Sequence, residues 1–153
     1  MDECIFKTKL ANVLIQVEDK SVIQICFTKR KIKLSDNHHL INAKKQVVEY
    51  IEGKRKIFTL KLDPNGTLYQ KKVWKELLTI PYGKTSSYLA QSRALGDVKA
   101  IRAVASANGR NPLLIIIPCH RIIGSDGSLT GYAGGIWRKK WLLAHENPLK
   151  QQS

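Results

Sequence analysis

Short runs of apolar residues separated by polar turns mark the first third of the chain. Such runs are typical of β-strands, whose side chains point alternately to the two faces of a sheet. The strands that we expect from these runs are Ile5–Leu10, Asn12–Val17, Ser21–Phe27 and Ile57–Leu62. Together they predict a small antiparallel sheet.

One stretch in this part of the chain has helical periodicity instead. Its apolar residues recur three or four positions apart, at Leu40, Ala43, Val47 and Ile51. This spacing predicts an amphipathic helix over about 39–52, ended by Gly53. The following Asp63-Pro64-Asn65-Gly66 is a strong turn signal. We therefore expect an α/β N-terminal domain over residues 1–64 and a mostly helical second domain over residues 65–153.

Beyond residue 66 the apolar positions follow helical spacing. A first helix is expected to bury one stripe, made of Val73, Trp74, Leu77 and Leu78. Thr85 or Ser86 can cap a second helix that runs to about Leu95. Asp97 can cap a third helix, to about Asn108. Two short helices joined by a glycine-containing turn predict a helix-turn-helix unit.

The third helix has two different faces. One face is mostly apolar and consists of Ile101, Val104, Ala105 and Asn108. The other is basic and small, and consists of Lys99, Arg102, Ala103 and Ser106. Small side chains allow a helix backbone to approach a nucleic-acid groove closely, and one long arginine can then reach beyond it. A plain amphipathic helix with a solvated arginine is the alternative interpretation.

The rest of the chain is expected to contain a buried segment, a turn and a last helix. Leu113–Ile117 is a continuous apolar run, which is typical of a fully buried segment. Ser125-Asp126-Gly127-Ser128 favours a hairpin-type turn. The last helix is predicted over about Gly135–Glu146. Its apolar face is expected to carry Trp137, Trp141 and Ala144.

The charge of the chain points to a polyanionic partner. The formal net charge is +14, and residues 67–153 carry 13 basic against 4 acidic side chains. Between Asp97 and Asp126 there is no acidic residue. A strongly basic protein is drawn to nucleic acid or to an acidic membrane surface. A solvated basic surface without a partner explains the charge equally well.

The cysteines and the N-terminus favour a reducing compartment. The start of the chain lacks the basic and apolar pattern of a signal peptide, and Leu113–Ile117 is too short to span a bilayer. Three cysteines without a secretory signal predict free thiols. We therefore expect a cytoplasmic protein, or a nuclear one in a eukaryotic source, with no membrane partner. Cys4, Cys26 and His38-His39 lack the spacing of a zinc site, so no metal is expected.

Cys119 is the main candidate for chemistry. A cysteine at the end of a buried apolar run is usually inert. This one is followed by His120 and Arg121, however, and a neighbouring base or positive charge can produce a reactive thiolate. Cysteine hydrolases use the same pairing, so these neighbours alone do not name the reaction.

Several motifs in a fixed order resemble one family. They are Gly109-Arg110-Asn111-Pro112, Pro118-Cys119-His120-Arg121, the Gly131–Gly135 run and Trp141–Glu146. These motifs are similar to those of the O6-alkylguanine-DNA alkyltransferases, and the likeness covers residues 68–146. It implies direct-reversal DNA repair, in which the alkyl group of O6-alkylguanine moves once and irreversibly to Cys119. Activity on O4-alkylthymine is implied as well.

The resemblance also implies roles for single residues. Glu146 matches the residue that orients His120, which acts through a water on Cys119. Tyr88 matches the tyrosine that helps to turn out the target nucleotide and donates a hydrogen bond to the base. Arg102 matches the arginine that fills the space left in the duplex, which is needed because extrusion of a base costs a few kcal/mol.

The remaining implied roles concern the substrate pocket and the DNA surface. Asn111 matches the hinge before the cysteine segment, and Tyr132 and Ala133 match the wall of the pocket. The carbonyls of Cys119 and Ile122 match the acceptors for the guanine amino group. The residues expected to bind DNA are Lys99, Arg102, Ala103, Ser106, Arg110 and Arg121.

The expected partner is double-stranded DNA that contains O6-alkylguanine, bound by a monomer without any cofactor. Two rival functions remain open from the residues. The first is a DNA-binding protein that flags alkylated bases without transfer, which Cys119 argues against. The second is a cysteine hydrolase, which would turn over repeatedly where a transferase stops at one equivalent.

Overall fold

The computed structural model describes residues 1–151, and the chain forms two compact units within it. The first unit contains residues 1–65 and 112–116, and the second contains residues 66–111 and the described residues from 117 onward. The first is an α/β unit and the second is mostly helical, which confirms the expected fold class. Residues 112–116 were expected with the second part of the chain. They join the first unit because their backbone bonds to its sheet: Ile25 N–H donates to the Pro112 carbonyl at 2.8 Å.

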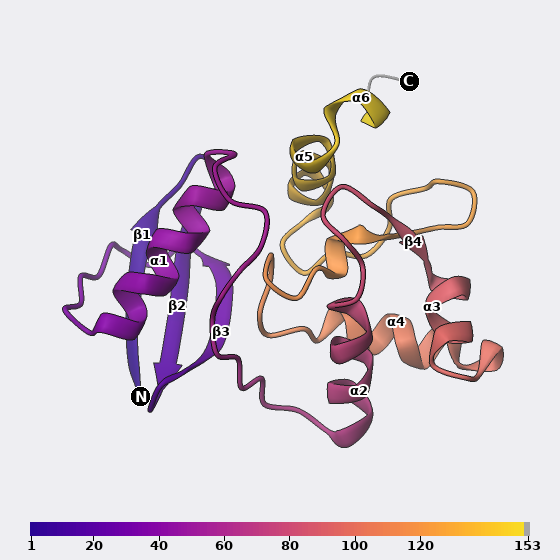
Figure 1. The fold of residues 1–153 in the computed structure, drawn as a ribbon, viewed down its shortest axis with the longest axis horizontal. Helices are drawn as coiled ribbons and strands as arrows, with labels where there is room; N and C mark the ends of the chain where they lie inside the picture. The colour runs from indigo at the N-terminus through magenta and orange to yellow at the C-terminus, as the bar shows by residue number, and fades with distance from the viewer. Residues whose placement is uncertain (152–153) are drawn as a thin grey trace. The chain divides into compact units, whose positions relative to one another are not determined.

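The first unit contains a three-stranded antiparallel sheet in the order β1-β2-β3 (Figure 1). The strands are β1 (Asp2–Lys7), β2 (Asn12–Glu18) and β3 (Ser21–Thr28). Helix α1 (His38–Ile51) lies over this sheet, and the Asn37 side chain caps its N-terminus. The core between them is almost entirely apolar. Its members include Ile5, Val13, Ile15, Val17, Ile25, Leu40 and Val47.

Two strand predictions in this unit need correction. The first strand ends at Lys7 rather than Leu10, because the Thr8 hydroxyl accepts from Leu10 N–H and Ala11 N–H and so closes a turn. Residues 57–62 do not form a strand, and only Leu62 makes a bridge, to Val22. The Gln46 side chain binds the backbone N–H of Thr59 at 2.9 Å, so a side chain of α1 replaces a strand partner there.

The second unit contains the expected succession of helices. They are α2 (Leu68–Leu77), α3 (Tyr88–Ala94), the 3₁₀ turn η1 (Val98–Ala100) and α4 (Ile101–Gly109). Thr67 and Gln70 form a capping box at the start of α2. The Trp74 indole donates to the Ala107 carbonyl at 2.8 Å, which joins α2 to α4. The amides of Gln91 and Asn108 pair at 2.7 and 2.8 Å and join α3 to α4.

Several details of these helices differ from expectation. Helix α3 is capped by Ser87 and not by Thr85 or Ser86, because strand β4 (Ser86–Ser87) pairs in parallel with β5 (Ile122–Ile123). Leu78, predicted in the apolar stripe, is half exposed beyond the end of α2. Asp97 caps the next turn as predicted, by accepting from Lys99 N–H at 2.9 Å. Ile101 is exposed rather than buried, while Ala107 takes the buried position.

The last part of the second unit consists of the 3₁₀ turn η2 (Cys119–Arg121), β5, α5 (Ile136–Glu146) and α6 (Pro148–Gln151). The predicted buried face of α5 was wrong at Trp137, whose exposed fraction is 55%. The buried residues of α5 are Lys139, Leu142, Leu143 and Glu146. Within residues 1–151 there is no helix with the length and apolar character needed to cross a membrane.

Candidate active site

Cys119 lies at the inner end of the apolar segment, where the chain turns into η2. Its N–H donates to the Ile117 carbonyl at 2.8 Å, and only 6% of the residue is exposed. The buried Asn111 amide holds this turn from the side. It donates to the Ile117 carbonyl at 2.8 Å and to the Cys119 sulfur at 3.3 Å. Asn111 therefore binds both the backbone of this turn and the thiol.

Burial raises the pKa of the Cys119 thiol to about 11. The hydrogen bond from Asn111 and the positive charge of Lys139 oppose this rise but are outweighed by it. The neighbouring His120 and Arg121 thus do not produce a thiolate by charge alone. With its pKa raised to about 11, the thiol is protonated at neutral pH, so attack by its sulfur needs a base that removes the proton.

A buried ionic cluster follows directly in the chain. His120 Nε2 lies 2.8 Å from Glu146 Oε2, and Arg121 binds the same carboxylate through Nε at 2.8 Å and Nη2 at 3.0 Å. All three residues are at most 7% exposed. Arg121 also donates to the Ile80 carbonyl. Arg121 is therefore an internal residue of this unit. The prediction that it belongs to the DNA-binding surface was wrong.

The protonation states in this cluster follow from the contacts. Burial alone would raise the pKa of Glu146, but hydrogen bonds and charge from His120 and Arg121 hold it well below its usual range. Burial lowers the pKa of His120 despite the neighbouring carboxylate. Ionised Glu146 therefore accepts a hydrogen bond from the Nε2–H of a neutral His120. The other ring nitrogen, Nδ1, is then a free base, and among the described residues it has no hydrogen-bond partner.

Tyr132 lies beside His120 of this cluster, and Tyr88 binds the chain at Thr130. The Tyr132 ring meets the His120 ring edge to face, with 6.4 Å between centroids. Burial, followed by the negative charges of Cys119 and Glu146, raises the pKa of the Tyr132 hydroxyl well above its usual value. The Tyr88 hydroxyl donates to the Thr130 carbonyl at 3.0 Å. The pairing of β4 with β5 brings Tyr88 toward the cysteine segment, since it follows β4 directly.

Lys139 is a buried residue of the site that the sequence analysis missed. It has no exposed surface, and its ammonium group donates to the Thr130 carbonyl at 2.9 Å. Burial lowers its pKa, and the negative charge of a Cys119 thiolate opposes that shift. The burial of Lys139 could have been predicted from helical spacing. Lys139 precedes Leu142, Leu143 and Glu146 by three, four and seven positions, which places it on the face that α5 buries.

The remaining predicted residues lie at the surface or along β5. The side chains of the basic face are exposed on η1, α4 and the end of α4, namely those of Lys99, Arg102, Ala103, Ser106 and Arg110. Ala133 is exposed, whereas Ile122 is fully buried. The Cys119 carbonyl already accepts from the Ile122 N–H, and its second lone pair remains for another donor.

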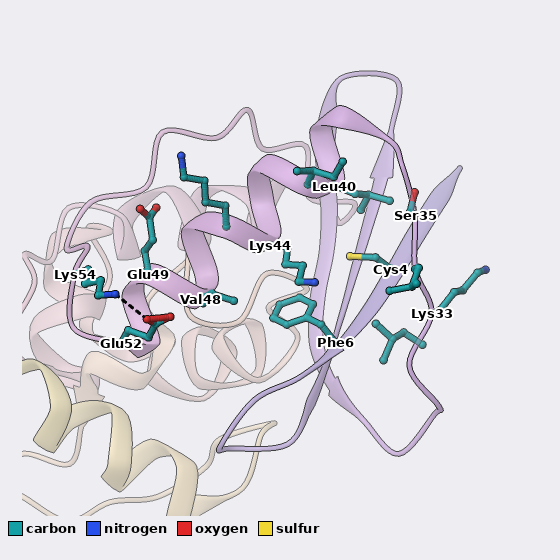
Figure 2. A pocket seen from close by; sticks show the side chains of 14 residues that line it. Cys4, Phe6, Lys33, Ser35, Leu40, Lys44, Val48, Glu49, Glu52 and Lys54 are labelled. Carbon is teal, nitrogen blue, oxygen red and sulfur yellow. Dashed lines mark hydrogen bonds and ion pairs between the residues drawn. The ribbon is translucent and has the colours of Figure 1, made fainter.

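A separate groove lies in the first unit, where none of the predicted site residues is found. Figure 2 shows it along α1, with Cys4 and Phe6 on β1 and Lys44 of α1 above the Phe6 ring. Its volume is about 470 Å³. The Cys4 thiol in its wall has a pKa raised by burial, but no imidazole is among the lining residues. The described part of the chain holds no group of three His, Cys, Asp or Glu residues placed to bind a metal.

The second unit thus defines a class of protein in which a helix-turn-helix element is built onto a buried Cys-His-Glu cluster. Residues 68–148 match the family model of the 6-O-methylguanine DNA methyltransferase DNA-binding domain. The chain belongs to this family. It is 43% identical to the methylated-DNA–protein-cysteine methyltransferase of Methanosarcina barkeri, over 95% of this chain and 98% of that protein. It is 41% identical to the constitutive Bacillus subtilis enzyme over 84% of each chain.

Solved structures agree with this assignment. The crystal structure of Mycobacterium tuberculosis O6-methylguanine methyltransferase superposes with a TM-score of 0.86 at 36% identity, over 95% of this chain and 92% of that chain. A structure of the mycobacterial protein in complex with DNA superposes with a TM-score of 0.85 at 37% identity, over 94% and 91% of the two chains.

Proposed function

We propose that this protein repairs alkylated DNA by moving the alkyl group from O6 of guanine to the sulfur of Cys119. The observation that carries the proposal is the placement of the thiol. Asn111 holds it at 3.3 Å, directly before the buried His120–Glu146 pair, within the stretch that matches the family model. The product is a thioether, which cannot release its alkyl group by simple hydrolysis, so each molecule acts once.

The transfer is a displacement at the alkyl carbon. A bond forms between Sγ of Cys119 and that carbon, the bond from carbon to O6 breaks, and the electron pair stays on guanine. Because the thiol is protonated at neutral pH, Nδ1 of His120 takes its proton through a bridging water. Ionised Glu146 stabilises the resulting imidazolium. The proton ends on guanine, which leaves as the normal base, so no cofactor takes part.

Tyr88 and the wall residues Tyr132 and Ala133 contact the flipped base in this proposal. Tyr88 donates a hydrogen bond that offsets the negative charge developing on guanine. The carbonyls of Cys119 and Ile122 accept from the guanine amino group, which distinguishes guanine from adenine at this edge. Asn111 keeps the cysteine segment in register with these groups.

The basic face of η1 and α4 is the DNA-binding surface in this proposal. Lys99 and Arg110 contact phosphates, and the small residues Ala103 and Ser106 allow the helix backbone to approach the groove. Arg102 enters the stack in place of the extruded nucleotide. Phosphate contacts carry no sequence information, so the protein binds duplex DNA as a monomer with little sequence preference and with affinity that falls as salt rises.

Intact-mass measurement tests the proposal. The protein is mixed with duplex DNA that contains one O6-methylguanine, and we expect a gain of one methylene mass, mapped to the peptide that carries Cys119. The Cys4→Ser variant, which lacks the other buried thiol, should gain the same mass. Binding without any mass change would identify a protein that only flags alkylated bases. Repeated turnover with unmodified protein would identify a hydrolase.

A further inference from the structure

The wall of the proposed substrate pocket belongs to a loop that contains two conformationally free glycines. This substrate loop, residues 130–135, contains Gly131 and Gly135 at φ values of 59° and 90°, in the left-handed region that favours glycine. Glycines lose more conformational freedom on ordering than other residues. The loop therefore keeps a defined position only if other groups hold both of its ends.

The first end of the loop is held at Thr130. Its carbonyl accepts from the Tyr88 hydroxyl at 3.0 Å and from the Lys139 ammonium at 2.9 Å. Within the loop, Gly135 N–H donates to the Tyr132 carbonyl at 2.9 Å and closes a turn. Tyr132, the residue against His120, lies between this fixed end and Gly135.

The second end of the loop is held by Arg138. Its Nη1 donates to the carbonyl of the buried Gly134 at 2.8 Å. The guanidinium carbon lies 4.4 Å from the centre of the Trp137 ring, within the range of a cation–π contact. Gly135 is the N-cap residue of α5 and provides no side-chain hydrogen bond there. The hydrogen bond from Arg138 is thus a side-chain restraint at the point where the loop joins the helix.

We propose that Arg138, held by Trp137, is a positioning residue that fixes the substrate loop and so sets the affinity of the pocket for the alkylated base. The inference rests on the proposed function, because it takes Tyr132 and Ala133 as the pocket wall. Adjacent residues of α5 then fix the two ends of one loop, Lys139 at Thr130 and Arg138 at Gly134. A preorganised wall lowers the entropy lost when the base binds.

The free base O6-benzylguanine separates this role from DNA binding, because no phosphate is present for an arginine to contact. Single-turnover rates are measured against its concentration. We expect Arg138→Ala to raise the half-saturating concentration about tenfold, the loss expected for one hydrogen bond from a charged group. The limiting rate should change much less. Arg138→Lys keeps a cationic donor and should recover part of the loss.

Lys140→Ala is the matched control, since it removes an exposed positive charge two positions further along the same helix. It should leave both parameters unchanged. The rate of Cys119 alkylation by iodoacetamide reports on the thiol without the base pocket and should be the same in all variants. Equal half-saturation for Arg138→Ala and wild type would overturn the proposal, as would equal losses for the alanine and lysine variants. If the wild type gains no methyl group from O6-methylguanine in duplex DNA, the proposed function fails instead.

Discussion

The two units of this protein bury different kinds of side chain. Among the buried polar residues of the described chain, the first unit holds only Ser21 and Gln46. The second unit holds the remaining eight, and four of them are ionisable: His120, Arg121, Lys139 and Glu146. Burial of an ionised group costs several kcal/mol, even in pairs, and such pairs stabilise a fold less than apolar packing does. The first unit is stabilised almost entirely by apolar packing. The second unit contains buried ionisable groups near the Cys119 thiol, although their burial costs free energy.

The two buried thiols, one in each unit, also differ in their surroundings. Burial raises the pKa of both Cys4 and Cys119, so neither is reactive through its own acidity. Cys119 differs because it receives a hydrogen bond from Asn111 and is followed by an imidazole whose Nδ1 is free. Chemistry at a buried cysteine therefore depends on polar neighbours in the same cluster, rather than on exposure.

The largest expected effect is on alkyl transfer, when Cys119 and Cys4 are replaced in turn. Cys119→Ser should abolish alkyl transfer while binding to alkylated duplex DNA remains, because a serine hydroxyl is almost un-ionised at neutral pH and is a poor nucleophile. Cys4→Ser should retain transfer. Transfer is measured by intact mass and binding by fluorescence anisotropy. Transfer by Cys119→Ser at a rate close to wild type would remove Cys119 from the mechanism.

The next effect concerns the buried carboxylate. Glu146→Gln leaves Arg121 buried without its anionic partner, and we expect a loss of about 3–5 kcal/mol in the free energy of unfolding. Glu52→Gln breaks an exposed pair with Lys54 in the first unit and should cost at most about 1 kcal/mol. Urea denaturation measures both. Similar losses for the two variants would contradict the contrast between the units.

The same carboxylate predicts a dependence of stability on pH. The pKa of Glu146 is lower in the folded protein than in the unfolded chain. Its stabilising contribution is therefore present above the ordinary glutamate pKa and is lost as the pH falls toward the folded value. Glu146→Gln lacks this group, so its unfolding free energy should fall less on acidification than that of wild type. Parallel acid titrations of the two proteins would show that Glu146 is not a source of the acid sensitivity.

A smaller effect is expected at the DNA surface. Arg102→Ala should slow repair of duplex DNA far more than repair of free O6-benzylguanine, because only the duplex requires extrusion of a base, at a few kcal/mol. Single-turnover rates on the two substrates give the comparison. Lys99→Ala on the same exposed face removes a phosphate contact and should mainly weaken binding. Equal losses on both substrates for Arg102→Ala would place this arginine in the pocket.

The smallest expected effect is a loss of thermal stability after Cys119 has been alkylated. Cys119 is 6% exposed within a packed segment, so an added benzyl group should overpack it and cost about 1–3 kcal/mol. The singly modified protein should melt at a lower temperature than the free one, as measured by calorimetry on a sample checked by mass. A Cys4→Ser/Cys26→Ser double variant removes both thiols of the first unit and confines the modification to Cys119. An equal or higher melting temperature would reject this expectation.

Local patterns predicted most of the fold. Period-two and period-three-to-four spacing placed β2, β3, α1 and α5 within a residue or two of their observed limits. The prediction of a strand at residues 57–62 was wrong. An alternating pattern shows that a segment can form a strand, but it does not show that a neighbouring strand is available to pair with it. Gln46 supplied that partner from α1. The face of α5 was misassigned because tryptophan is bulky and apolar, yet Trp137 stacks on Arg138 at the surface.

The sequence by itself determined the candidate nucleophile, because the residues around Cys119 and the motifs on either side are contiguous. It also determined the exposed basic face of α4, since helical spacing depends only on neighbours. Tertiary structure alone decided the electrostatics of the site. Glu146 lies 26 positions from His120, and Lys139 becomes buried only when α5 packs. The pKa of Cys119 rises rather than falls because the cost of burying a charge depends on the whole surrounding volume, which no short motif records.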